Sequence, residues 1–66
     1  MTMQFHIPTL EDQQAAQDLK ELILTSESGA DIEIDTQSKV ITIESKASEE
    51  TFRELIVAAG HSIKED

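Results

Sequence analysis

The feature that most restricts the fold is a pair of strand-like segments separated by only four residues, 36–39. In residues 30–35 apolar and acidic side chains alternate, and residues 40–44 are mostly β-branched. Both patterns are typical of strands, and alternation with period two places one face against a core and the other in water. Since the connection is too short for a crossover, the two strands must form an antiparallel hairpin. We expect Ile41 and Ile43 to face the core.

Two helices and two more strands are predicted around this hairpin. Residues 3–7 alternate as a half-buried strand, which Pro8 ends. A helix is expected over residues 11–25, with Glu11 and Asp12 in its first turn, where carboxylates interact favourably with the unpaired backbone N–H groups. A second helix begins after the capping residue Ser48 and stops at Gly60, and residues 61–63 form a short last strand. The helical positions expected to face the core are Ala15, Ala16, Leu19, Leu22, Ile23, Phe52, Leu55, Ile56 and Ala59.

This order of elements, βαββαβ, indicates an α+β fold, the ferredoxin-like sandwich. In that fold two helices cover one face of a four-stranded antiparallel sheet. A chain of 66 residues has room for a single domain, which we expect to span residues 3–64. The sequence contains no cysteine, so neither a disulfide nor a thiolate-bound metal can reinforce the small core.

The charge balance restricts the partners. Fourteen acidic against five basic residues give a formal net charge of −9, which repels nucleic acids and anionic membranes and attracts cations or basic protein surfaces. Aromatic residues make up 3% of the chain, with no Trp or Tyr, so there is no stacking platform for single-stranded nucleic acid. The N-terminal residues lack a basic stretch and a long apolar run, so we expect no membrane insertion and a cytoplasmic protein. The sequence makes no prediction of oligomeric state.

Four short segments carry a family resemblance: residues 5–10 (FHIPTL), 32–35 (IEID), 40–43 (VITI) and 58–61 (AAGH). Together they resemble the heavy-metal-associated domain, the family of small copper chaperones and of the N-terminal modules of metal-pumping ATPases. Their order and spacing agree with the family over residues 3–64. The resemblance implies the same ferredoxin-like fold, with strand order 4-1-3-2.

The resemblance fails at the residues that bind the metal. The family carries two cysteines in a Met-x-Cys-x-x-Cys loop after its first strand. Aligning Leu10 with that Met places Asp12 and Ala15 at the two cysteine positions. Copper(I) is a soft ion that prefers thiolates, and a carboxylate and a methyl group cannot replace two sulfurs. We therefore expect the scaffold without its thiolate metal chemistry and without a cofactor.

An alternative is that harder ligands have replaced the cysteines. The fold is expected to bring the start of the last strand, with His61, close to the end of the first strand. Glu11 and Asp12 at the start of the first helix, together with His61, therefore form a candidate site for zinc or another divalent metal. The competing interpretation is structural: the two acids stabilise the helix start, and His61 is a packed ring in place of an aromatic residue. His6 is expected on the open face of the sheet, away from such a site.

The acids of the second strand form a candidate partner-binding strip. Asp31, Glu33 and Asp35 share one face of that strand, which the family's strand order places at a sheet edge. Charges on an edge discourage strand addition by other chains, so protection is one interpretation of the strip. Docking of a basic protein partner is the other.

No arrangement of residues supports catalysis. The serines have no histidine and acid that the fold gathers beside them, and two glycines are too few for a phosphate-binding loop. The sequence thus favours a small, soluble, non-enzymatic protein-interaction module on a metal-chaperone scaffold. The alternative is a divalent metal-binding or metal-trafficking protein that uses Asp, Glu and His ligands.

Overall fold

The predicted hairpin forms two of the strands of the sheet. In the computed structural model, which describes residues 2–64, it consists of β2 (Asp31–Asp35) and β3 (Val40–Glu44). The turn between them reverses the chain at Lys39, whose φ of 61° lies in the left-handed region. The Asp35 carboxylate stabilises this turn by accepting a hydrogen bond of 2.9 Å from the backbone N–H of Gln37. The bounds of β3 match the prediction, and those of β2 differ by one residue.

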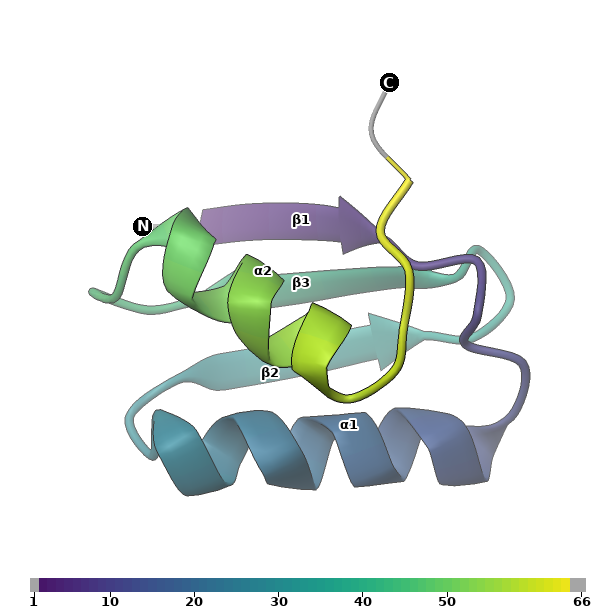
Figure 1. Ribbon diagram of the computed structural model, residues 1–66, viewed down its shortest axis with the longest axis horizontal. Helices are drawn as coiled ribbons and strands as arrows, with labels where there is room; N and C mark the ends of the chain where they lie inside the picture. The colour runs from purple at the N-terminus through teal and green to yellow at the C-terminus, as the bar shows by residue number, and fades with distance from the viewer. Residues whose placement is uncertain (1, 65–66) are drawn as a thin grey trace.

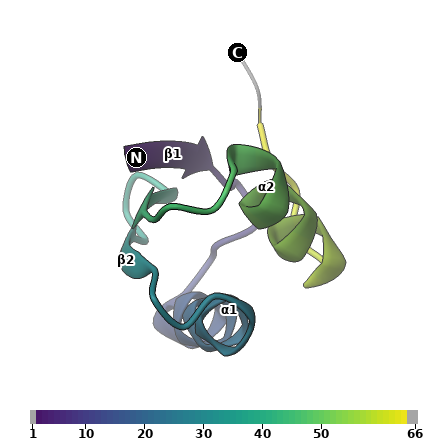
Figure 2. The same cartoon turned by 90° about the vertical axis from the view of Figure 1, so that its left-hand side faces the viewer.

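A third strand, β1 (Thr2–His6), pairs antiparallel with the other side of β3, so the described strands follow the order β1-β3-β2. The two helices are α1 (Gln13–Ser26) and α2 (Glu49–Ala58), and both lie on the same face of this sheet (Figures 1 and 2). The α+β class and the two-layer arrangement are confirmed. The order also confirms that β2 lies at a sheet edge.

The predicted fourth strand is wrong for the part of the chain that the structure describes. The segment after α2 meets the end of β1 at one bridge, in which the backbone N–H of Lys64 donates to the carbonyl of His6 at 2.8 Å (Figure 1). Two preceding N–H groups are used elsewhere, because His61 donates to the carbonyl of Ile56 and Ser62 donates to the hydroxyl of Thr9. In the register of this bridge residues 61–63 lie opposite residues 7–9, beyond the end of β1, and Pro8 has no backbone N–H to donate, so no ladder forms there.

The helix starts differ in how well they were predicted. Ser48 caps α2, and Glu49 and Glu50 lie in its first turn, as expected. Asp12 was expected inside the first helix, but it is the residue that caps α1, with extended φ and ψ of −150° and 176°. No acid lies in the first turn of α1, because Glu11 precedes the cap. The helix therefore starts at Gln13 and continues through Ser26.

The core lies between the sheet and the helices. Two predicted core positions are wrong: Leu22 is 38% exposed, and Ala59 is exposed beyond the end of α2. The remaining predicted positions are buried or half-buried, and Ile41 and Ile43 are fully enclosed. The buried core consists of Met3, Phe5, Ile7, Leu10, Ala16, Leu19, Ile23, Ile32, Ile41, Ile43, Phe52 and Ile56.

Candidate functional site

The loop between β1 and α1 lies against the segment that follows α2. The hydroxyl of Thr9 is 2.7 Å from Nδ1 of His61, and it also accepts a hydrogen bond of 3.2 Å from the backbone N–H of Ser62. Leu10 is fully buried beneath the loop, and its N–H donates to the carbonyl of Ile7. The predicted proximity of residue 61 to the end of the first strand is therefore present, and Thr9 makes the contact.

The three predicted metal ligands do not form a metal-binding group in this structure. Residues 2–64 contain no group of three or more His, Cys, Asp or Glu side chains that could hold a metal ion. Asp12 accepts a hydrogen bond of 2.8 Å from the backbone N–H of Ala15, which satisfies one unpaired donor of the helix start. Glu11 is exposed, and Nδ1 of His61 contacts Thr9. The contacts of Asp12 and His61 thus join parts of the fold.

The face of the sheet opposite the helices, here called the open sheet face, gathers acidic side chains. Asp31, Glu33 and Asp35 lie on it from β2, and the register places Glu44 of β3 beside Asp31. All four side chains belong to exposed residues. The other positions on this face are Thr2, Gln4, His6, Val40 and Thr42, so none of them carries a Lys or Arg.

Among the described residues no ion pair links the carboxylates of the open sheet face to a basic side chain, although Lys46 lines a surface pocket together with Asp31 and Glu44. Between residues 2 and 64 the ion pairs join Arg53 to Glu49 and Glu50 on α2, at 3.5 Å each. Backbone N–H groups at Gln37, and then at Ser38, hold the pKa of Asp35 below its ordinary value. The open sheet face is therefore a strip of negative charge at neutral pH.

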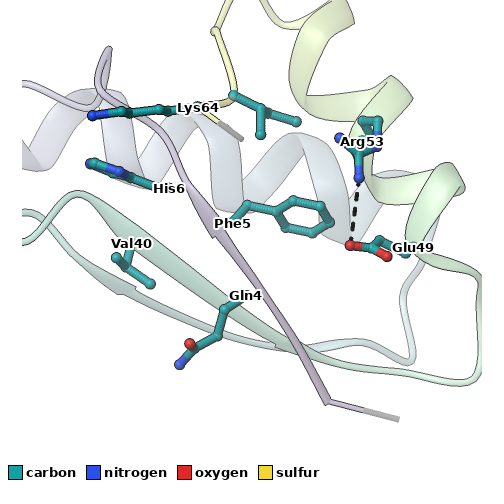
Figure 3. Close-up of a pocket in the computed structure, with 8 residues that line it drawn as sticks. Gln4, Phe5, His6, Val40, Glu49, Arg53 and Lys64 are labelled. Atoms are coloured by element: carbon teal, nitrogen blue, oxygen red, sulfur yellow. Dashed lines mark ion pairs between the residues drawn. The ribbon is translucent and has the colours of Figure 1, made fainter. Parts of the chain in front are cut away.

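A pocket of about 350 Å³ between β1 and α2 was not predicted from the sequence (Figure 3). Its guanidinium group, Arg53, lies 5.9 Å above the ring of Phe5 and pairs with Glu49. The spacing of Glu49, Glu50 and Arg53 along α2 was the available signal, because residues three and four apart on a helix are neighbours.

Comparisons with solved structures identify the scaffold. The solution structure of a cyanobacterial copper metallochaperone, ScAtx1, is 31% identical to this chain and has a TM-score of 0.81; the match covers 97% of this chain and 100% of that one. The chain belongs to the family of Atx1-type copper chaperones. The heavy-metal-associated resemblance found in the sequence is confirmed.

Other solved structures agree. A mutant of the copper chaperone Atx1 from Synechocystis PCC6803, in a trimeric form, matches with a TM-score of 0.89 and 27% identity over 94% of this chain and 98% of that one. A gold binding protein matches with a TM-score of 0.86 and 26% identity over the same shares. Neither a family model nor a curated protein matches the chain.

Membership of the copper-chaperone family raises the question of whether these residues fit a copper ion. The chain has no cysteine, and the two positions that the resemblance assigns to cysteines are Asp12 and Ala15. In the structure these two residues are joined by the capping hydrogen bond. The donor set does not fit a soft Cu(I) ion, which prefers sulfur ligands. Among residues 2–64, no helix is long and apolar enough to cross a membrane.

Proposed function

We propose that this chain is a non-enzymatic, cytoplasmic protein-interaction module on the copper-chaperone scaffold, and that it binds a basic protein partner through the open sheet face. The observation that carries the proposal is the set of exposed carboxylates at Asp31, Glu33, Asp35 and Glu44, which lie on one face without basic neighbours on it. A basic surface placed on this strip relieves the mutual repulsion of the acids and makes new ion pairs.

The proposal does not include the thiolate metal chemistry of the family. The supporting reasons are the absence of cysteine from the sequence and the hydrogen bond that makes Asp12 a helix cap. We also propose that no resident metal or other cofactor is required. The competing hypothesis, a divalent metal bound by Glu11, Asp12 and His61, predicts a different set of responding residues.

The strength of the ion pairs between these acids and a basic partner is limited because the acids are exposed to solvent. An exposed ion pair contributes about 0.2–1 kcal/mol, so the acids of the strip together supply only a few kcal/mol. Because salt screens charges over about 8 Å at physiological ionic strength, binding should weaken steeply as salt is added. The acids thus mainly select the partner and speed its association, and apolar contacts must supply the rest of the affinity.

Two variants with the same net charge test the proposal. The test variant carries Asp31→Asn, Glu33→Gln and Asp35→Asn. The control variant carries Asp18→Asn, Glu21→Gln and Glu54→Gln, which are exposed positions on the helices. Both lose three negative charges, and the amide side chains keep the hydrogen-bond acceptors of Asp35, Asp18 and Glu21.

The measurement is calorimetric titration with a lysine-rich peptide at low salt. We expect at least about a tenfold loss of affinity in the test variant, equivalent to about 1.4 kcal/mol, and a smaller loss in the control variant. Equal losses in both variants would mean that net charge alone attracts the peptide, and the proposed site would be wrong.

A further inference from the structure

The alternation of hydrogen-bonded pairs in the sheet determines which backbone N–H and C=O groups of β2 are free. The N–H of Ile7 donates to the carbonyl of Lys39 at 2.8 Å, and in the β1–β3 register this pair continues to Phe5–Ile41. In an antiparallel ladder hydrogen-bonded pairs alternate, and each residue directs its N–H and C=O to the same side. Ile41 therefore points its backbone groups toward β1, and its neighbours in β3 point theirs toward β2.

The same alternation continues across β2. Because Glu33 lies opposite Thr42, it directs its backbone groups toward β3, and so do the two ends of β2. Ile32 and Ile34 then direct their N–H and C=O groups outward, along the free edge of the sheet. Within residues 2–64 no strand or loop pairs with this edge. The bridge from Lys64 to His6 is consistent with this alternation, because the N–H of Lys64 donates to the carbonyl of His6, which faces away from β3.

A surface groove of about 390 Å³ runs beside this edge, between β2 and α1. Figures 1 and 2 both show α1 alongside β2. The helix lines the groove with Gln13, Ala16, Gln17 and Lys20, and the strand adds Ile32, Glu33 and Ile34. On the helix side the edge is therefore bordered by small, apolar and uncharged polar groups with one lysine, and on the other side it is bordered by the acids of the open sheet face.

We propose that the free edge of β2 accepts an extended segment of the basic partner as an additional strand. The proposal rests on the proposed function and deepens it by specifying the mode of binding. Side chains of an added strand alternate between the two faces of the sheet. Those beside Asp31, Glu33 and Asp35 are basic, and those beside Ile32 and Ile34 are apolar and lie over the groove. The fitting segment therefore alternates basic and apolar residues.

Charge decides between this occupant and two others. A second copy of this chain would bring the same acids against the strip, and two chains of net charge −9 repel each other. An acidic or neutral strand gains nothing from the carboxylates, so the edge charges exclude most strands and admit a basic one. The edge acids thus provide protection and selection through the same groups.

The opposite edge, along β1, differs from the β2 edge in its charge and in the backbone groups that it leaves free. Lys64 is already bridged to His6 there, and Arg53 lies over Phe5 in the neighbouring pocket (Figure 3). A basic segment is repelled by Lys64 at that edge, and the backbone carbonyl of His6 is already used by the N–H of Lys64. The backbone N–H of Gln4, which faces outward from β1, therefore serves as an internal control for binding at β2.

The test uses one peptide with a central Lys-Val-Lys-Val-Lys segment in three forms. One is unmodified, one is methylated on the backbone nitrogens of both valines, and one is methylated on the backbone nitrogens of the lysines. If the valines lie opposite Ile32 and Ile34, their N–H groups face β2, and those of the lysines face away. We expect valine methylation to lower the affinity at least about tenfold and lysine methylation to change it little. Amide hydrogen exchange at Ile32 and Ile34 should slow on binding, and exchange at Gln4 should not.

The other outcomes separate the two proposals. If all three peptides bind equally, but the variant lacking the charges of Asp31, Glu33 and Asp35 does not bind them, then strand addition is wrong and docking on the open sheet face stands. If no form of the peptide binds even at low salt, both proposals are wrong. Slowed exchange at Gln4 in place of Ile34 would assign the peptide to the β1 edge and would overturn the inference.

Discussion

Replacing Asp12 with alanine removes the cap of α1, and the expected loss follows from the contacts of this side chain. Its Oδ1 atom accepts a hydrogen bond of 2.8 Å from the N–H of Ala15. Removing such a cap costs about 1 kcal/mol, with a range of about 0.5–2, and the position is exposed, so water can partly replace the carboxylate. Loss of the negative charge beside the helix start adds about 0.3–1 kcal/mol at low ionic strength.

Thermal unfolding followed by circular dichroism measures this loss. In a domain of this size about 1 kcal/mol shifts the Tm by about 4–8 °C, so a combined loss of about 1.3–2 kcal/mol in Asp12→Ala should lower the Tm by about 5–16 °C. Asp12→Asn keeps the hydrogen-bond acceptor and loses only the charge, so its smaller deficit should vanish at high salt. Glu11→Ala is the control, because Glu11 is exposed and makes no side-chain hydrogen bond among the described residues.

The reasoning is refuted if Asp12→Ala is no less stable than Glu11→Ala. It is also refuted if zinc raises the Tm of the unmodified chain by several degrees and this rise disappears in both Asp12→Ala and His61→Ala. In that case the two side chains would be metal ligands, because a ligand that binds only the folded state stabilises it.

Three further predictions concern stability. Gly60→Ala should cost about 1 kcal/mol in denaturant unfolding, because φ is +91° there with no atom within 4 Å of an added Cβ, and Gly29→Ala, without a positive φ, should cost less. Phe52→Ala should leave the chain largely unfolded by circular dichroism, since losing a fully buried ring costs about 3–5 kcal/mol, comparable with the stability of so small a core. The N–H of Gln37 lowers the pKa of Asp35 in the folded state, so the contribution of Asp35 to the free energy of unfolding is present above about pH 3.9, the pKa of an unfolded Asp. That contribution is lost as the pH falls through the lower pKa of the folded state. Asp35→Asn should therefore make the stability measured by urea unfolding less sensitive to acid.

Local signals predicted the elements that local chemistry determines. The short connection between β2 and β3 allows only a hairpin, and the alternation within both strands determines which side chains reach the core. Ser48 and Gly60 mark the limits of α2 because a hydroxyl cap and a left-handed glycine act within one turn of the helix. These parts of the fold could be predicted from the sequence.

The errors at the last strand and at the start of α1 concern choices between competing hydrogen-bond partners. The backbone N–H groups of His61 and Ser62 can pair with β1 or with acceptors in α2 and the loop, and no local pattern decides between these partners. Asp12 can lie inside a helix or cap it, and its extended backbone determines the outcome. The proximity of His61 to the loop was predicted, but its contact with Thr9 depends on tertiary structure.

The central claim is that this copper-chaperone scaffold serves protein contact without its family's metal chemistry. The most direct measurement follows the backbone amide signals of the protein by NMR while Zn(II) and Cu(I) are added in turn. The account predicts weak, unsaturated shifts spread over the acidic residues, including Asp31, Glu33 and Asp35. Tight, saturable shifts confined to residues 8–15 and 60–63, and lost in His61→Ala, would contradict it.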